Sequence, residues 1–310
     1  MTDLPSSTTG SAVVTPLHAD TAFRRFSRDF FASTSATVAC IVLGALILAA
    51  LLAPWIAPQN PYDLTVLDIM DSRLEPGAVS SDGALRFLLG SDEQGRDMLS
   101  AILYGLRISL LVGFSSTVIA LAIGLTLGLL AGYAGGRTES LIMRIADIQL
   151  SFPAILIALI LLALMGQGTG KIITALVLVQ WAYYARTARS AALVERRKEY
   201  IEAAIGLGLS PARIILRHLL PNCLPPLIVI SALQVASAIS LEATLSFLGL
   251  GLPVTEPSLG LLIANGFQYM LSGKYWMSFF PGLALLLTVV TINLVADQLR
   301  DVLNPRLQLH

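Results

Sequence analysis

The chain has 310 residues, of which 55% are hydrophobic and 13% are charged, and its formal net charge is zero. Soluble domains carry roughly 25% charged residues, so this composition excludes an ordinary soluble protein and predicts an all-α polytopic membrane protein. The balanced charge gives no reason to expect a nucleic-acid partner, and the lipid bilayer is the expected surrounding.

The first expected elements are a tail and one membrane helix. Residues 1–29 are polar and contain Arg24, Arg25 and Arg28, which predicts a cytoplasmic N-terminal tail. Residues 30–62 carry no charge, and prolines follow the apolar core at 36–53. A helix needs about 20 apolar residues to cross the hydrocarbon. Residues 30–107 are therefore expected to hold the first transmembrane helix and a long periplasmic loop.

Five further transmembrane helices are expected within a core domain at 108–310, giving six in all. They are expected at 108–136, 148–170, 172–185, 219–241 and 275–296. The span at 172–185 is short because Lys171 and Arg186 flank it, and it can cross the bilayer if both side chains snorkel to the interface.

The basic residues predict the orientation of these spans. With the N-terminus in the cytoplasm, 14 of the 20 lysines and arginines fall in cytoplasmic segments, as the positive-inside rule requires. Both termini and a loop at 182–222 are then cytoplasmic, and a loop at 242–274 lies on the opposite, periplasmic side. Residues 257–270 are apolar but too short to cross, which leaves a re-entrant helix and a packed outer helix as alternatives.

One span carries small residues at every fourth position. They are Ser116, Ala120, Gly124, Gly128 and Gly132. Such a stripe lets another helix approach closely. The sequence leaves open whether that helix belongs to this chain or to another subunit.

The sequence offers no catalytic or metal-binding constellation. The stretch "GQGTGK" at 166–171 lacks the spacing and the hydroxyl residue of a phosphate loop, so it predicts a turn. Glu242 and Asp297 are expected at span ends, where their charges can reach water. An ion-coupled secondary transporter usually carries ionisable residues within the membrane, so that class is the disfavoured alternative. A membrane-embedded enzyme is disfavoured because clustered ligands and nucleophiles are missing.

The most informative stretch is "EYIEAAIGLGLSPARIILRHLLPN" at 199–222. Glu195, Glu199 and Glu202 have the spacing of one helical face. Gly206 and Gly208 predict a helix end with a left-handed cap, and Ser210-Pro211 predicts a restart. Arg213 and Arg217 are expected on one face of the second helix, and Pro221 at the entry into the fifth span. The pattern predicts a cytoplasmic helix pair that docks on a partner.

This stretch resembles the coupling motif of permease subunits of binding-protein-dependent ABC importers. The motif residues here are Glu202, Ala203, Ala204, Gly208, His218, Leu219, Leu220 and Pro221. His218 departs from the broad family, which has an apolar residue there, but "RHLLPN" is similar to the peptide-importer branch. The stretches "LGSDEQGRDMLSAILYGLRISL" (89–110), "SFLGLGLP" (246–253), "FPGL" (280–283) and "LRDVLNPRL" (299–307) resemble its C-type permeases, although Asn304 replaces a more usual Asp.

The resemblance implies a non-catalytic permease subunit in the bacterial inner membrane. It implies a heterodimer with a homologous B-type permease, two ABC ATPase subunits, and a periplasmic or extracellular substrate-binding protein. No cofactor is expected on this chain, since ATP and Mg would bind the ATPases. Di- or oligopeptides are the expected cargo, with nickel, glutathione, opines or sugar-like solutes as alternatives. The sequence identifies no substrate-binding residues.

Overall fold

The computed structural model describes residues 22–63, 65, 67–253 and 255–303, and this part of the chain is helical without a β-sheet. The helices are α1 (Ala22–Phe31), α2 (Thr34–Ile56), α3 (Met98–Ala134), α4 (Gly136–Leu150), α5 (Ala154–Met165), α6 (Thr169–Arg196), α7 (Glu199–Gly206), α8 (Pro211–Ile214), α9 (Leu220–Phe247), α10 (Leu259–Phe267) and α11 (Trp276–Leu303). Short helical turns lie at Ile69–Asp71 and Met270–Ser272, and a π-helix at Ile215–Leu219 joins α8 to α9. The all-α prediction is therefore confirmed.

The predicted count of six spans is not reproduced. Within the described residues, four helical stretches are long and apolar enough to cross a membrane. They are Thr34–Ile56, Met98–Ala134, Pro211–Phe247 and Trp276–Leu303. A fifth span results only if the bent pair α4 and α5 crosses as one unit.

The third predicted span, 148–170, is not a single straight helix. α4 and α5 meet at an angle of 90°, and the break falls at Ser151, Phe152 and Pro153. Proline lacks a backbone N–H and disfavours a helical conformation in the residue before it, so the chain turns here. α5 has 12 residues and is about 18 Å long, which is shorter than the hydrocarbon core of roughly 30 Å.

The fourth predicted span lies within α6, which has 28 residues but is not among the four apolar spans. α6 packs against α3 and α9, and its Gln180 is buried and donates to the backbone oxygen of Gln234 in α9 (3.1 Å). A helix enclosed by other helices can carry polar groups if they are hydrogen-bonded.

Two helices extend beyond their predicted bounds. α3 begins at Met98, ten residues before the predicted span, because the side chain of Asp97 caps it by accepting from the Ser100 backbone N–H (2.8 Å). α9 continues past the predicted end at Leu241 to Phe247. The predicted periplasmic loop at 242–274 therefore starts at residue 248, and its apolar part forms the packed helix α10.

The predicted N-terminal tail is partly folded. Residues 22–29 belong to α1, which packs against α2 and α11. The Gln298 side chain donates to the backbone oxygen of Asp29 (3.2 Å), and the rings of Phe26 and Phe30 stack. The rest of the predicted tail and Asn304 lie outside the described residues.

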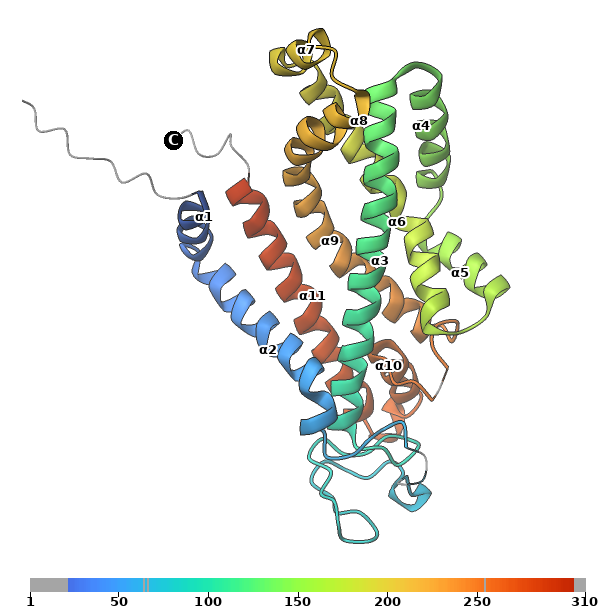
Figure 1. Ribbon diagram of the computed structural model, residues 1–310. Helices are drawn as coiled ribbons and strands as arrows, with labels where there is room; N and C mark the ends of the chain where they lie inside the picture. The colour runs from blue at the N-terminus through green and yellow to red at the C-terminus, as the bar shows by residue number, and fades with distance from the viewer. Residues whose placement is uncertain (1–21, 64, 66, 254, 304–310) are drawn as a thin grey trace, which may run out of the picture.

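The molecule has two distinct ends (Figure 1). α7, α8, α1 and the C-terminal end of α11 lie at one end, and the loop at 57–97 and α10 lie at the other. Within that loop Arg96 and Asp92 form a buried ion pair of 2.6 Å. The loop is thus a folded cap over the helix ends.

Candidate functional site

The coupling segment, residues 199–222, occupies the end of the molecule where α6 stops and α9 begins (Figure 1). α7 ends at Gly206, and Gly208 follows in the left-handed region with φ of +71°. The Leu209 backbone N–H donates to the oxygen of Ala204 (3.2 Å), which closes the turn. Glycine adopts this conformation without steric cost, so the predicted left-handed cap is present.

The second helix restarts at Pro211, the first residue of α8. Ser210 occupies the capping position in an extended conformation, but its side chain makes no capping hydrogen bond. The fixed φ of proline suits a first helical turn, so Pro211 accounts for the restart and the Ser210 hydroxyl does not.

One face of the coupling segment is anchored to the helix bundle. Its buried side chains are Ile201, Ala204, Ile214 and Leu219. They belong to a cluster with Tyr184, Ala188 and Ala192 of α6 and Leu227 of α9. A displacement of this face therefore displaces the ends of α6 and α9.

The opposite face is exposed and mixes charge with apolar surface. The exposed residues include Glu199, Glu202, Ala203, Gly208, Arg213 and Arg217, together with Ile205, Leu207 and Leu216. Leu207 is 80% exposed. Apolar side chains surrounded by charged ones are typical of surfaces that bind another protein.

Glu195 does not share this face, contrary to the prediction. α6 ends at Arg196 and α7 starts at Glu199, so the 195–199–202 spacing crosses a helix boundary. The break occurs because Lys198 is extended. The Glu195 carboxylate accepts from Lys198 Nζ (2.5 Å) and from the Tyr200 hydroxyl (2.7 Å), so it fixes the corner between the helices.

Tyr200 links the coupling segment to α9. Its hydroxyl accepts from the Asn222 side-chain amide (3.2 Å), which also donates to the His218 backbone oxygen (2.7 Å). Burial and then the Glu195 carboxylate raise the pKa of Tyr200 to about 12, so the phenol keeps its proton at neutral pH. The His218 ring lies 6.4 Å from the Tyr200 ring. The sequence analysis missed the roles of Tyr200 and Asn222, although Asn222 ends the "RHLLPN" stretch.

Pro221 is not a break before a separate span. The helical stretch is continuous from Pro211 to Phe247. Leu220 and Pro221 are the first two residues of its α9 part. The Leu220 N–H bonds to the Ile215 oxygen in the wide π-type turn just before the proline. A proline ring clashes with the carbonyl four residues earlier in a regular α-helix, and a π-bulge relieves that clash. Arg213 lies in α8 and Arg217 lies within the π-helix, and both side chains are exposed.

The small-residue stripe of α3 lies against α6 of the same chain. Its members Ala120, Gly124, Gly128 and Gly132 are buried. A Cβ atom added at Gly128 would lie 2.5 Å from the Ala185 oxygen and 2.6 Å from the Ala188 Cβ. The two backbones approach as closely as glycine permits.

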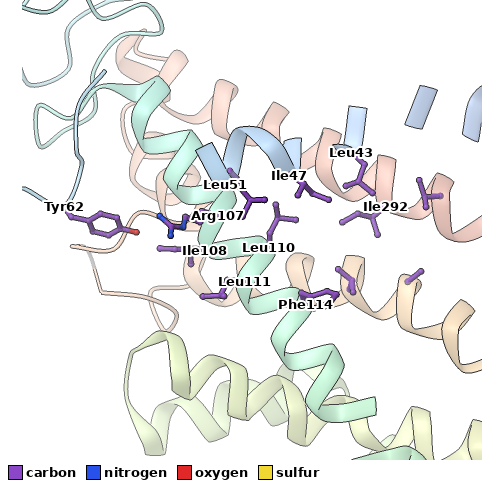
Figure 2. A pocket seen from close by; sticks show the side chains of 14 residues that line it. Leu43, Ile47, Leu51, Tyr62, Arg107, Ile108, Leu110, Leu111, Phe114 and Ile292 are labelled. Carbon is purple, nitrogen blue, oxygen red and sulfur yellow. The ribbon is translucent and has the colours of Figure 1, made fainter. Parts of the chain in front are cut away.

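A large apolar cleft opens between α2, α3, α9 and α11, and Figure 2 shows its lining side chains. Its volume is about 820 Å³. The lining residues are Leu43, Ile47, Ala50, Leu51, Tyr62, Arg107, Ile108, Leu110, Leu111, Phe114, Ala232, Val235, Ile292 and Val295. Arg107 and Tyr62 are the polar side chains, and they lie at the end of the cleft nearest the 57–97 loop (Figure 2). Residues from four distant segments form the cleft, so no local pattern could have revealed it.

Glu242 is buried, whereas the sequence analysis placed it at a span end in reach of water. It is 0% exposed and lies inside α9, which continues to Phe247. Asp297 lies near the C-terminal end of α11 and is exposed, as predicted. The turn predicted at 166–171 is shorter, because α6 starts at Thr169; it covers 166–168, with φ of +82° at Gly166 and +135° at Gly168.

Two family models match the chain. Residues 124–309 match the binding-protein-dependent transport system inner membrane component. Residues 21–76 match the N-terminal TM domain of oligopeptide transport permease C.

Curated relatives match over nearly the whole chain. The Di/tripeptide transport system permease protein DppC of Pseudomonas aeruginosa is 39% identical over 92% of both chains. The Dipeptide transport system permease protein DppC of Escherichia coli K12 is 39% identical over 93% of this chain and 94% of the relative. The inward-facing MetNI methionine ABC transporter has a similar fold, with a TM-score of 0.56 and 22% identity over 67% of this chain and 98% of that chain.

Proposed function

Because the chain belongs to the family of binding-protein-dependent transport system inner membrane components, we propose that it forms half of a peptide pathway. The chain is a membrane permease of the ABC importer class. The named relatives are permeases for dipeptides and tripeptides, which supports di- or oligopeptides as cargo. Nickel, glutathione or another small solute is the alternative cargo within the same class.

The proposed complex divides the work among several chains. A homologous B-type permease supplies the other half of the pathway, and a substrate-binding protein delivers the cargo at the end formed by residues 57–97 and α10. Two ATPase subunits bind and hydrolyse ATP with Mg at the end formed by the coupling segment. Both chain termini then lie in the cytoplasm. This chain lines half of the pathway and provides the coupling segment that the ATPases displace, and it hydrolyses no ATP itself.

The observation that carries this proposal is the two-sided coupling segment. Its buried face packs against α6 and α9, and its opposite face exposes Glu199, Glu202, Arg213 and Arg217. An ATPase bound to the exposed face can displace the segment when it closes around ATP. The displacement would reach α6 and α9 and switch the pathway between its inward-open and outward-open states.

The apolar cleft between α2, α3, α9 and α11 is the proposed contribution of this chain to the pathway. Its apolar lining suits varied peptide side chains, since such contacts are not directional. Arg107 and Tyr62 at its outer end can contact the polar backbone of a peptide.

The test compares the same substitution at two glycines of the coupling segment. Gly208→Val places a β-branched residue at φ of +71°, at a cost of about 1–3 kcal/mol. Gly206→Val is the matched control, because Gly206 is helical and has open space around it. We expect Gly208→Val to insert in the membrane but to lose uptake and release the ATPases, and Gly206→Val to keep both.

The measurements are uptake by reconstituted complex and ATPase retention on the purified permease pair. Normal uptake by Gly208→Val with its ATPases bound would contradict the coupling role. Equal loss in both variants would show that bulk at the surface matters and the left-handed turn does not.

A further inference from the structure

A carboxyl group with three serine neighbours lies buried near the outer end of α9. The Ser109 hydroxyl of α3 donates to Oε2 of Glu242 (3.0 Å), and the Ser246 hydroxyl of α9 donates to Oε1 (2.8 Å). Ser258, which caps α10 by accepting from the Leu261 backbone N–H (3.2 Å), is the third serine beside the carboxyl group. One side chain thus connects α3, α9 and the start of α10.

Within the described part of the chain, no cationic side chain lies against this carboxyl group. Glu242, Ser109 and Ser258 are each 0% exposed, and no lysine or arginine pairs with Glu242 among the described residues. Burying a carboxyl group without a cation is costly unless it is hydrogen-bonded, and truncating one member leaves the other buried polar groups unsatisfied. The arrangement is therefore stable only while all three elements stay in place.

The backbones around Glu242 are in direct contact. A Cβ atom added at Gly260 of α10 would lie 2.3 Å from the Ala243 oxygen of α9. One added at Gly105 of α3 would lie 3.2 Å from the Leu259 backbone nitrogen of α10. Close packing of this kind leaves no room for α10 to slide over α9 or α3.

The same helix leads from this junction to the coupling segment. Pro211–Phe247 is one continuous helical stretch of 37 residues. Its first turns belong to the coupling segment, and Glu242 lies near its other end. Over this length a helix with the standard rise spans about 55 Å, which exceeds the thickness of the hydrocarbon core.

We propose that Glu242 is a positioning residue that fastens α10 to α9 and α3, so that a displacement of the coupling segment moves α10 at the outer end. This inference rests on the proposed function, because it requires that the coupling segment is displaced by an ATPase. The role of Glu242 is to join α10 to the long helix Pro211–Phe247, and its buried side chain does not contact the cargo.

The experiment uses the complete reconstituted complex and measures uptake per ATP hydrolysed. Glu242→Leu removes every hydrogen bond, and Glu242→Gln keeps the shape and two hydrogen-bonding atoms. We expect Glu242→Leu to retain bound ATPases and ATP hydrolysis while uptake per ATP falls about tenfold, a typical size for coupling between sites. We expect uptake per ATP in Glu242→Gln to stay within about threefold of the parent value, because this variant loses only part of the interaction.

A second readout follows α10 directly. A cysteine at the exposed Gln268, in a background without Cys40 and Cys223, is labelled with an impermeant thiol reagent in the presence and absence of ATP. In the parent the labelling rate should change with nucleotide, and in Glu242→Leu this change should disappear. An unchanged uptake per ATP in Glu242→Leu would overturn the proposal, and so would a Glu242→Gln variant as uncoupled as Glu242→Leu.

Two single-hydroxyl variants serve if Glu242→Leu fails to assemble. Ser109→Ala and Ser258→Ala each remove one link, and each should lower uptake per ATP about twofold to threefold. Normal coupling in both would overturn the positioning role. The two proposals fail separately: if Gly208→Val releases the ATPases while all Glu242 and serine variants transport normally, the coupling segment retains its role and Glu242 does not.

Discussion

Two glutamates of this chain have opposite surroundings, and the surroundings decide what each can do. Glu202 is exposed on α7, where its carboxylate is available to a partner. Glu242 is enclosed by serine hydroxyls from α3 and α9. Glu195 differs again, because its bonds to Lys198 and Tyr200 hold a corner of the fold. The contacts of each carboxyl group therefore decide whether it is open to a partner, enclosed between packed helices or part of a corner of the fold.

The substitution Glu202→Ala should weaken binding of the ATPase only mildly. An exposed ion pair contributes less than about 1 kcal/mol, so the dissociation constant should rise less than about fivefold. The measurement is titration of the ATPase onto the purified permease pair at low and high salt, and the difference from the parent should shrink at high salt. Glu75→Ala, exposed at the opposite end, is the control and should have no effect. A loss of binding beyond about 30-fold would contradict a surface ion pair at position 202.

Helices α3 and α6 pack closely because small residues line α3 where the two meet. At Gly124 an added Cβ atom would lie 2.4 Å from the Trp181 oxygen, and at Gly132 it would lie 2.7 Å from the Ala192 Cβ. α6 can therefore be partly polar, since α3 and α9 shield it from lipid. At the other extreme, α5 is short, apolar and bent away from α4, because Pro153 interrupts the helix between them.

A matched pair of glycine substitutions tests this packing. Gly128→Ala places a methyl group 2.5 Å from a backbone oxygen of α6, whereas Gly44→Ala in α2 meets nothing within 4 Å. Overpacking costs about 1–3 kcal/mol, so Gly128→Ala should lower the melting temperature of the purified complex and Gly44→Ala should leave it unchanged or raise it. Equal melting temperatures for the two variants would show that α3 and α6 separate without cost.

The whole molecule is organised by its two ends. The coupling segment, α1 and the end of α11 lie at one end of the molecule, and the folded loop at 57–97 lies with α10 at the other (Figure 1). Pro211–Phe247 connects the two ends as one helical stretch. Under the proposed function, a displacement of the coupling segment would reach the other end through this helix as long as the junction at Glu242 holds.

Cysteine labelling in intact cells tests the orientation of these ends. In a background without Cys40 and Cys223, Ser190→Cys and Ala84→Cys each place a thiol at an exposed position. The excess of basic residues near the coupling segment predicts a cytoplasmic Ser190. An impermeant reagent should therefore label only Ala84→Cys from outside, and both variants after permeabilisation. Labelling of Ser190→Cys in intact cells would reverse the proposed orientation.

The sequence by itself determined the features that depend on local chemistry. Apolar length predicts α2 and α11, because crossing hydrocarbon demands a run of uncharged residues. The glycine at 208 and the proline at 211 predict the turn between α7 and α8, because each restricts the backbone within a few residues. The resemblance of residues 199–222 to a coupling motif was visible in the sequence because the motif residues lie within one short segment.

The tertiary structure alone decided what depends on distant neighbours. Whether Glu242 reaches water depends on residues distant in sequence: Ser109 of α3 is 133 positions away, and Ser258 at the start of α10 is 16 positions away. The span count changed because α6 is shielded by other helices and the α4–α5 pair bends. The cleft of Figure 2 exists only where α2, α3, α9 and α11 converge. Sequence patterns report the preference of each segment, while burial and cavities arise from how the segments pack against one another.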